Sequence, residues 1–329
     1  MVRDANRHHA PSSLARGLFV ACLSLLSFGN AWAQGREKVG DGDTLQVTFV
    51  GDLLLDRGVR ERIDTLGVDT LFSPSVDSLF AASHLVVANL ECPATHVRAP
   101  RHKVYIFRGD PEHLPLLHRH GITHLILANN HSIDQGRRGL MDTRRNIEAA
   151  GMVPVGAGSN MQEASQPVLL ADTPREVWLL SSLRLALENY AYLPDSPCVS
   201  QEPMDTLVAR VARLRQQSPG AYIIVSLHWG GENTMRPILR QVSDAHRLVE
   251  AGADLLVGHH SHTFQSVEQY RGATIFYSIG NFIFDAHRPI HQKACAAVAA
   301  ITADGASVRA VPLFIEDCTP VVEEEQMSR

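Results

Sequence analysis

The sequence predicts a single-domain α/β fold, chiefly because apolar and amphipathic segments alternate along the chain. Short apolar, β-branched runs are separated by longer stretches in which apolar residues recur at helical spacing. The chain has 329 residues, of which 45% are hydrophobic and 20% charged, so it is long enough to bury a large core. Alternation of this kind is typical of α/β proteins, in which helices pack on the faces of sheets.

Seven segments have the composition of buried strands, because each is a short and nearly continuous run of apolar and β-branched residues. These segments are residues 47–50, 84–88, 124–128, 177–181, 222–227, 254–257 and 274–279. Four intervening segments show helical spacing, and a glycine stands where three of them end. The predicted helices are residues 111–120, 138–150, 204–217 and 238–251.

Residues 1–33 predict a secretory signal peptide. Three arginines precede or flank the start of an apolar run at residues 18–28, and Ala31-Trp32-Ala33 supplies the small-x-small pattern of a cleavage site. The apolar run is well below the roughly 20 residues that span a bilayer. We therefore expect an exported, periplasmic or extracellular protein. Its expected parts are the signal peptide at 1–33, a polar leader at 34–44, a folded domain at 45–318 and an acidic tail at 319–329.

Charge and cysteine content narrow the classes of partner and compartment. The net charge is −5, and no long run of Lys or Arg follows the N-terminus, which argues against nucleic acid as an obligate partner. Four cysteines follow residue 33, and in an oxidising compartment they allow three pairings. They are Cys92, Cys198, Cys295 and Cys318. We expect the last two to form a disulfide.

Polar residues of metal-ligating types follow five of the predicted strands. In chain order these endings are Gly51-Asp52, Asn89-Leu90-Glu91, Asn129-Asn130-His131, His228-Trp229-Gly230 and Gly258-His259-His260-Ser261-His262. Sites in α/β sheets assemble beyond the carboxyl ends of strands, so we expect these endings to form one cleft. Taken singly, each has an ordinary explanation as a cap, a turn, a loop acid or a buried core histidine. Their coincidence at strand ends favours a shared metal site.

The donor types in these endings suit divalent metal ions, with Mn, Zn and Fe as candidates. The expected ligands are two carboxylates, one amide oxygen and three imidazoles, from Asp52, Glu91, Asn130, His228, His260 and His262. One carboxylate could bridge two ions. Two ions about 3.5–4 Å apart activate water and hold the oxygens of a phosphoryl or carbonyl centre. The neutral amide oxygen completes a coordination sphere without adding charge.

Six motifs, in their order along the chain, resemble those of the bacterial capsule synthesis protein CapA family. They are residues 49–52 (FVGD), 89–91 (NLE), 128–136 (ANNHSIDQG), 228–232 (HWGGE), 258–262 (GHHSH) and 277–285 (YSIGNFIFD). The resemblance extends from about residue 44 to about residue 285. It implies a link to poly-γ-glutamate capsule production. It also implies a four-layer αββα sandwich of the calcineurin-like metallophosphoesterase type.

The metallophosphoesterase pattern also implies roles for individual residues. Asp52 would bind the first metal ion, Glu91 would bridge, and Asn130 would bind the second ion. The histidines at 228, 260 and 262 would complete the two coordination spheres. His131 would be the acid that protonates the leaving group, and Asp134 would orient it.

Three further residues are expected to contact substrate, namely Glu232, Asn281 and His259. Glu232 follows a Gly-Gly pair, and Asn281 follows a strand near the histidine turn. His259 is open to either interpretation, because the run of histidines leaves the ligand register uncertain by one residue. Arg57 and Lys103 are additional candidates for contact with an anionic substrate.

The chain departs from the metallophosphoesterase pattern at its first strand. Leu53 and Leu54 follow Asp52 where the pattern Asp-x-His would place an imidazole. One or two metal ions are therefore expected. The favoured function is an exported, metal-dependent, phosphatase-like hydrolase that acts on an anionic polymer or a phosphorylated small molecule, with a membrane-bound capsule synthesis complex as a possible partner. Two alternatives remain open: an amide hydrolase or transferase acting on the polymer, and a non-catalytic polymer-binding scaffold.

Overall fold

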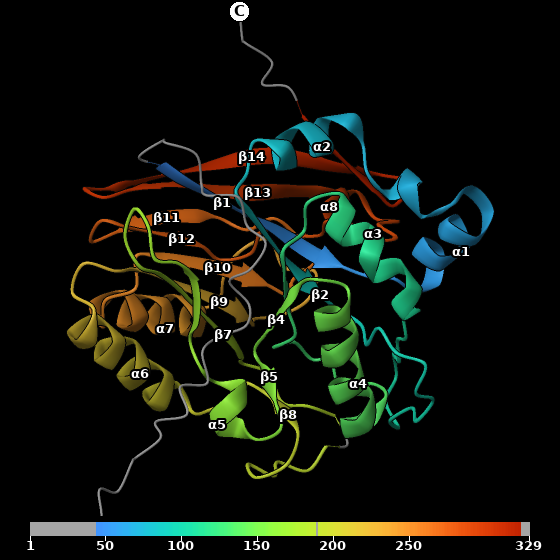
Figure 1. The fold of residues 1–329 in the computed structure, drawn as a ribbon, viewed down its shortest axis with the longest axis horizontal. Helices are drawn as coiled ribbons and strands as arrows, with labels where there is room; N and C mark the ends of the chain where they lie inside the picture. The colour runs from blue at the N-terminus through green and yellow to red at the C-terminus, as the bar shows by residue number, and fades with distance from the viewer. Residues whose placement is uncertain (1–43, 189, 324–329) are drawn as a thin grey trace, which may run out of the picture. The chain divides into compact units, whose positions relative to one another are not determined.

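The computed structural model of the chain describes residues 44–188 and 190–323. The predicted signal peptide at residues 1–33 lies outside the described residues, as do residues 34–43 of the leader and residues 324–329 of the tail. Two large sheets pack face to face, and helices cover their outer faces (Figure 1). None of the helices in the two described ranges has the length and apolar character needed to cross a membrane.

The first sheet has seven strands. In spatial order they are β15 (Thr319–Val322), β14 (Ala306–Glu316), β13 (Lys293–Thr302), β1 (Thr44–Leu53), β2 (Leu85–Leu90), β3 (His124–Ile126) and β4 (Val153–Val155). Strands β1 to β4 are parallel, whereas β13, β14 and β15 extend the sheet with antiparallel pairings. Every residue of β2 is buried, as expected for a parallel strand that is covered on both faces.

The second sheet has six strands. In spatial order they are β11 (Val267–Tyr270), β12 (Ala273–Phe276), β10 (Leu255–His259), β9 (Tyr222–His228), β7 (Val177–Leu183) and β6 (Val168–Ala171). The four central strands are parallel, and the two edge strands are antiparallel to their neighbours. A separate ribbon pairs β5 (Ala157–Gly158) with β8 (Cys198–Val199).

An apolar core fills the space between the two sheets. Phe49 and Ile126 of the first sheet belong to the same buried cluster as Leu179, Ile224 and Val257 of the second. Alternate residues of a strand point to opposite faces, so each strand supplies this core with every second side chain. Burying one such side chain contributes roughly 1.5–3 kcal/mol. The core therefore holds the carboxyl ends of both sets of parallel strands at one end of the sandwich.

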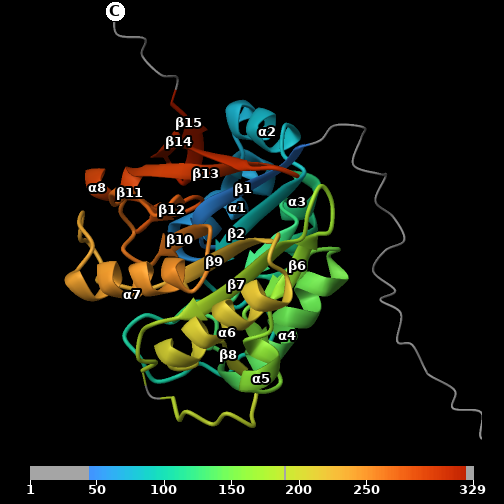
Figure 2. The same ribbon diagram turned by 90° about the vertical axis from the view of Figure 1, so that its left-hand side faces the viewer.

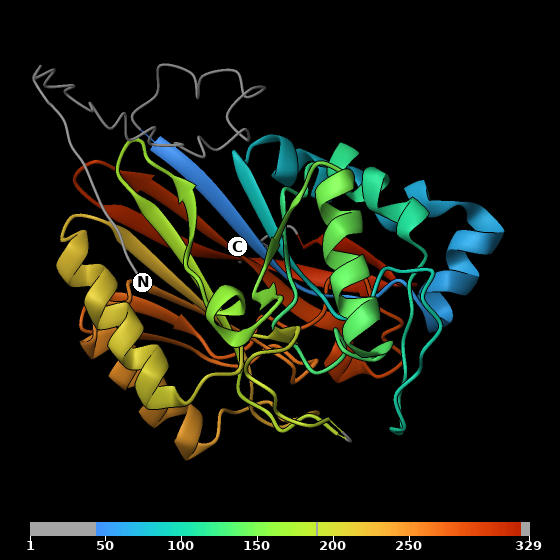
Figure 3. The same ribbon diagram turned by 60° about the horizontal axis from the view of Figure 1, so that its bottom comes forward.

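Helices form the two outer layers (Figures 2 and 3). The outer face of the first sheet packs on α1 (Arg57–Leu66), α2 (Pro74–Ala81), α3 (Leu114–Arg119) and α4 (Gly136–Ala149). The outer face of the second sheet packs on α6 (Met204–Gln217) and α7 (Leu239–Glu250). The remaining short helical segments are η2 (Val68–Leu71), η3 (Pro111–His113), α5 (Met161–Ala164) and α8 (Pro289–Gln292). The result is the four-layer αββα sandwich that the resemblance implies.

The predicted strands and helices are all found, although several bounds move by a few residues. Two corrections concern the C-terminal third. The sequence prediction did not include β13 and β14, which are the long antiparallel strands beside β1. Residues Thr319–Val322 were assigned to the acidic tail, but they form β15 and pair with β14. The ordered fold therefore extends past the predicted domain boundary at residue 318.

The prediction of a disulfide between Cys295 and Cys318 is wrong. Both cysteines are buried and free, as are Cys92 and Cys198. Cys295 lies in the core between the sheets, whereas Cys318 lies in the cluster on the outer face of the first sheet. Two side chains on opposite faces of a sheet cannot approach within disulfide-bonding distance.

Candidate metal centre

Asp52 stands near the end of β1, where this strand meets the segment that follows β12. The register between β1 and β2 shifts between Val50 and Asp52, and such a bulge redirects the side chain. The Asp52 N–H donates to the Gly280 carbonyl at 3.1 Å, and the Asp52 carbonyl accepts from the Phe282 N–H at 2.8 Å. Gly51 permits this approach, because a Cβ there would lie 2.0 Å from the Gly280 oxygen. Asp52 is consequently held in a fully buried position.

Glu91 follows β2 and is also fully buried. Its N–H donates to the Leu53 carbonyl at 2.8 Å, which fixes the backbone. Neither carboxylate oxygen of Glu91 has a hydrogen-bond partner among the described residues. Burial and then the negative charge of Asp52 raise the pKa of Glu91 well above its ordinary value. A buried carboxylate without donors is costly, and a bound cation would offset that cost.

His260 and His262 lie on the turn after β10. Their backbone φ angles are 92° and 56°, a left-handed region that non-glycine residues seldom occupy outside turns and functional sites. His262 Nδ1 lies 3.3 Å from Asp52 Oδ2 and 2.9 Å from Asn281 Oδ1. His262 Nε2 lies 3.9 Å from Glu91 Oε1. The His260 N–H donates to Asp52 Oδ2 at 3.3 Å, so the turn is tied to β1.

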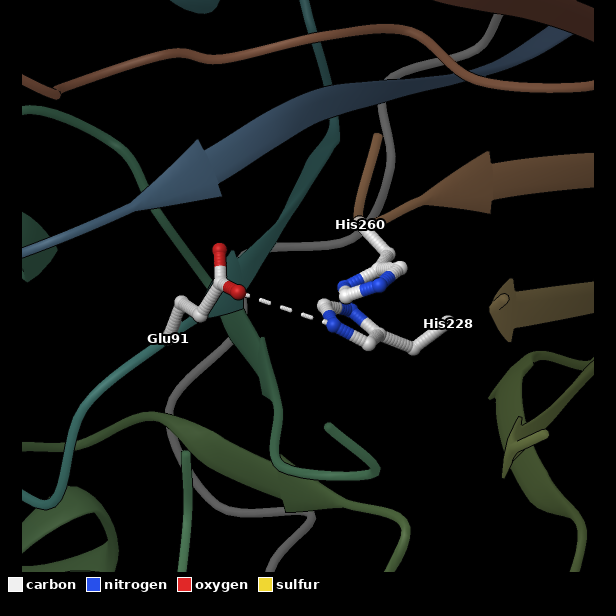
Figure 4. Close-up of side chains that lie close together, drawn as sticks. All are labelled: Glu91, His228 and His260. Carbon is white, nitrogen blue, oxygen red and sulfur yellow. Dashed lines mark ion pairs between the residues drawn. The ribbon is translucent and has the colours of Figure 1, made fainter. Parts of the chain in front are cut away.

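A second set of side chains, which includes His228 and His260, also reaches Glu91. His228 ends β9, and its Nε2 lies 2.8 Å from Asn130 Oδ1 and 3.5 Å from Glu91 Oε1. The ring centroids of His228 and His260 are 4.8 Å apart. Figure 4 shows these two rings beside the Glu91 carboxylate. The strand ends of both sheets thus contribute to one site.

Electrostatics prepare Asp52, His228 and His260 as ligands. Burial acts to raise the pKa of Asp52, but the imidazoles of His259 and His262 outweigh it and hold the pKa well below its ordinary value. Burial lowers the pKa of His260 to about 4. Burial likewise lowers the pKa of His228 well below its ordinary value. Both imidazoles are therefore neutral at neutral pH, which is the form that binds a metal ion.

The pKa of His262 is shifted in the opposite direction. Burial acts to lower it, but Glu91 and Asp52 outweigh burial and raise the pKa of His262 to about 10. A metal ion would therefore have to displace that proton.

Glu91 is shared by two groups of potential ligands. The ligand atoms of Asp52, Glu91 and His262 lie within 4.8 Å of one another, and those of Glu91, His228 and His260 do the same. Both Glu91 oxygens and Nδ1 of His260 are buried without a hydrogen-bond partner among the described residues. Mixed carboxylate and imidazole donors suit Mn, Zn or Fe. The residues present therefore fit divalent metal ions, with Glu91 in a bridging position.

His131 forms a buried dyad with Asp134. His131 Nδ1 lies 2.8 Å from Asp134 Oδ2, which also accepts from the Phe107 N–H at 2.8 Å. Lys103 Nζ donates to Asp134 Oδ1 at 2.8 Å and to the Asn130 carbonyl at 3.0 Å. Burial lowers the pKa of His131, although Asp134 opposes that shift. Lys103, which the sequence suggested as a substrate contact, is instead buried in an ion pair that neutralises Asp134.

Two asparagines that sequence reasoning missed hold the ligands in place. Asn89 Nδ2 donates to Asp52 Oδ1 at 2.8 Å and lies 3.3 Å from His228 Nδ1. Asn129 Nδ2 donates to Asn89 Oδ1 at 3.0 Å, while Asn129 Oδ1 accepts from the His131 N–H at 3.1 Å. Their position beside Glu91 and His131 in the sequence was the available signal. They connect the first three strand ends through one buried hydrogen-bond network.

The three residues expected to contact substrate differ in exposure, since one lines the cavities and two are buried. Glu232 is exposed and lines the cavities at the centre. His259 is only 1% exposed, and its Nδ1 lies 3.4 Å from Asp52 Oδ1. Asn281 is fully buried and holds His262, as described above. Substrate contact by His259 and Asn281 is therefore not supported, because both side chains are buried against ligand residues.

Two cavities flank the centre. One, of about 320 Å³, is lined in part by His131 and His262. The other, of about 270 Å³, is lined in part by Asn130 and His260. Glu232 lines both. Each group of candidate ligands thus has one histidine that lines a cavity, His262 in the first group and His260 in the second.

The sandwich has a metallophosphoesterase-like fold. Among solved structures, a putative 5'-nucleotidase from Staphylococcus aureus in complex with alpha-ketoglutarate has a TM-score of 0.53 at 12% identity, covering 87% of this chain and 56% of that chain. The NAD nucleotidase of Haemophilus influenzae has a TM-score of 0.50 at 10% identity, covering 86% of this chain and 52% of that one. These likenesses show the fold. The chain spans little more than half the length of either.

Residues 46–286 match the family model for the bacterial capsule synthesis protein PGA_cap, and the chain belongs to this family. The PGA biosynthesis protein CapA of Bacillus subtilis is 30% identical over 273 residues, covering 81% of this chain and 71% of that protein. The capsule biosynthesis protein CapA of Bacillus anthracis is 30% identical over 275 residues, covering 80% and 66%. A probable polyglutamine synthesis accessory protein of Mycobacterium tuberculosis is 32% identical over 194 residues, covering 56% and 50%.

Proposed function

We propose that the protein is an exported, metal-dependent, phosphatase-like hydrolase that serves the synthesis of an anionic extracellular polymer, such as poly-γ-glutamate. The observation that carries the metal-dependent chemistry is Glu91, whose two unpartnered oxygens lie between two groups of ligands. Family membership supports the role in polymer synthesis. Export and association with a membrane-bound synthesis complex belong to the same proposal.

The side chains at the centre have distinct tasks in this proposal. Divalent ions bound here would supply Lewis-acid chemistry, which activates water and offsets charge on substrate oxygens. Glu91 would hold the bound metal, and the buried network around Asn89 keeps Asp52 and His228 in place. Asp134 occupies Nδ1 of His131, so Nε2 is the ring atom left to protonate a leaving group. Lys103 donates to Asp134 Oδ1 and so holds this carboxylate in its orientation toward His131.

Metal content tests the ligand assignment. Purified protein should bind one or two divalent ions per chain, and the double variant His260→Ala, His262→Ala should lose them, measured by inductively coupled plasma mass spectrometry. His246→Ala is the matched control. His246 lies on α7 and pairs with Glu268 of β11, and it belongs to neither group of candidate ligands. Unchanged metal content in the double variant would contradict the assignment of these two histidines as ligands.

The activity is tested with phosphomonoester and phosphodiester substrates in the presence of manganese or zinc. His131→Ala should lower kcat by about 10²–10⁴-fold, the usual contribution of a general acid, while metal content stays the same. Turnover that is independent of added metal and of His131 would contradict the proposed chemistry.

The non-catalytic scaffold remains the second candidate, because the first strand lacks the imidazole of the Asp-x-His pattern. Leu53 and Leu54 are fully buried in the core and supply no ligand. In this case, metal-loaded protein should retain poly-γ-glutamate in a pull-down without converting any ester. Cleaved or transferred amide products, detected by mass spectrometry, would instead support action on the polymer backbone.

A further inference from the structure

Exposed apolar side chains gather beside the metal centre. Of the eleven large hydrophobic side chains that are exposed in the described part of the chain, six lie on two loops or, in the case of Leu239, at the first residue of α7, which follows the second loop. These six are Val104, Tyr105, Ile106, Met235, Ile238 and Leu239. Val104 is 80% exposed and Leu239 is 88% exposed, so both project into solvent. Apolar groups concentrated in this way mark an interaction surface more often than scattered ones do.

The two loops flank one cavity of the metal centre. Tyr105 of the first loop and Asn233 of the second both line the cavity that contains His131 and His262. A third segment contacts the second loop, because Arg288 Nη1 donates to Asn233 Oδ1 at 2.6 Å, and Arg288 also lines this cavity. We call residues 96–106, 233–240 and 286–291 the rim of the cleft.

The rim is locally basic in an acidic chain. None of its three segments contains Asp or Glu, although the whole chain has 35 of them and a net charge of −5. Its basic side chains are Arg98, Arg101, Lys103, Arg236, Arg240 and Arg288. Lys103 is neutralised by Asp134, Arg240 pairs with Asp244 on α7, and Arg101 also interacts within the protein, so Arg98, Arg236 and Arg288 are the cations that the inference uses. Two acids adjoin the rim in sequence, Glu232 and Asp285. Both line the cavity that contains His131 and His262, and Asp285 is paired with Arg57.

We infer that the rim docks on an anionic lipid bilayer, with the mouth of the metal cleft facing the membrane surface. Apolar tips interleaved with arginines match the interfacial region of a bilayer, where side chains such as Leu and Tyr enter the headgroup boundary and arginines contact lipid phosphates. A protein interface needs about 800 Å² of complementary surface on each partner. Six apolar side chains on separate segments beside a polar cavity suit insertion between lipid headgroups better than they suit a continuous protein interface. This inference does not depend on the proposed catalytic activity.

Vesicle flotation of the full chain tests the docking. The protein should float with vesicles of phosphatidylcholine and phosphatidylglycerol, and Val104→Ser with Leu239→Ser should weaken binding about tenfold or more. The control is Leu66→Ser with Leu169→Ser, which removes exposed apolar groups from α1 and β6 and should leave binding unchanged. Residues 1–33 are the same in every variant, so differences report the rim. Equal binding by the rim variant and the control variant would overturn the inference.

The dependence of vesicle binding on the arginines and the insertion of Val104 into the bilayer are tested separately. Arg98→Gln with Arg236→Gln should weaken binding to the anionic vesicles about tenfold and leave binding to pure phosphatidylcholine unchanged. An environment-sensitive dye on Val104→Cys should shift its emission to the blue with anionic vesicles, whereas the same dye on Leu169→Cys should not. Identical dye responses at the two positions, or rim-dependent self-association of the protein without vesicle binding, would contradict membrane docking.

Discussion

Asp52 reaches the metal centre because Gly51 lets β1 approach the Gly280 backbone. The side chain of any other residue at position 51 would place its Cβ 2.0 Å from the Gly280 oxygen. Because a backbone oxygen cannot rotate away, β1 or the facing segment would have to move. The hydrogen bonds of Asp52 to Gly280 and Phe282 would then be strained, and the carboxylate would shift with them.

We predict that Gly51→Ala lowers the free energy of unfolding by about 1–3 kcal/mol, the usual cost of overpacking, and also lowers metal content. Gly220→Ala is the matched control, since nothing lies within 4 Å of a Cβ at that position. Its effect on stability should stay within about 0.5 kcal/mol. Urea unfolding and metal analysis of the two variants check the prediction, and similar results for both would contradict it.

Glu91 provides a second test at the residue scale. Burial and the charge of Asp52 raise the pKa of Glu91, so the ionised side chain is unfavourable without a cation. We expect Glu91→Gln to lose metal from both ligand groups, yet to be at least as stable as the parent in the presence of a chelator. Thermal unfolding with and without chelator, alongside metal analysis, measures both effects. Glu232→Gln should keep the metal, because Glu232 belongs to neither group of candidate ligands.

At the scale of elements, Glu163 of α5 ties this short helix to α4. Arg144 Nη1 contacts Glu163 Oε1, and the Ser159 N–H donates to Glu163 Oε2 at 2.9 Å. Burial acts to raise the pKa of Glu163, but Ser159 and Arg144 outweigh it and lower the pKa from 4.5 to about 2. The ionised form is therefore favoured in the folded state.

A depressed carboxyl pKa stabilises the fold above the unfolded-state value, and this contribution is lost as pH falls through the folded-state value. We predict that the stability difference between the parent and Glu163→Gln is constant above about pH 5 and shrinks from pH 4.5 toward pH 2. Denaturant unfolding across that range measures it. Glu61→Gln, on an exposed position of α1, is the control. A difference that did not change with pH would rule out this ion pair as its source.

Elements also differ in how well the sequence predicted them. The helix at residues 204–217 was predicted with its observed bounds, because Met204, Leu207, Val211 and Leu214 repeat at helical spacing on its buried face. The strand β13 reads Lys-Ala-Cys-Ala-Ala-Val-Ala-Ala-Ile-Thr and was missed. Alanine favours helices when isolated, so local composition gave no strand prediction there. Pairing with β1 and β14 decided its conformation.

At the scale of the whole molecule, the metal centre joins the two sheets. Asp52 and Glu91 come from the first sheet, whereas His228, His260 and His262 come from the second. Ions bound by both sets would add a link between the sheets beyond the apolar core. Unfolding of either sheet would disrupt the site, so metal binding would be coupled to global stability.

We therefore predict that chelation lowers the Tm. Free metal at about a hundredfold above its Kd should stabilise the folded state by about 2.7 kcal/mol, and the Tm should rise with metal concentration. Differential scanning calorimetry over a metal titration checks this. Glu91→Gln should show no such rise. A Tm that is independent of metal in the parent protein would mean that the centre does not hold ions in the folded state.

The sequence alone was enough to predict the α/β class, the αββα layers through family resemblance, and the gathering of polar side chains from several strand ends at one place. These features follow from local patterns, because buried parallel strands are short apolar runs and sites form where such strands end. The motif order also pointed to the family that the comparisons establish.

Only the tertiary structure decided which side chains of one motif lie among the candidate ligands and which pack beside them. Within the histidine turn, left-handed backbone at His260 and His262 places these two side chains in the ligand groups, while His259 packs against Asp52. The turn geometry depends on hydrogen bonds to a strand some 200 residues away in sequence, which no local pattern encodes. The same holds for Cys295 and Cys318, because the face of the sheet on which each lies is set by long-range strand pairing.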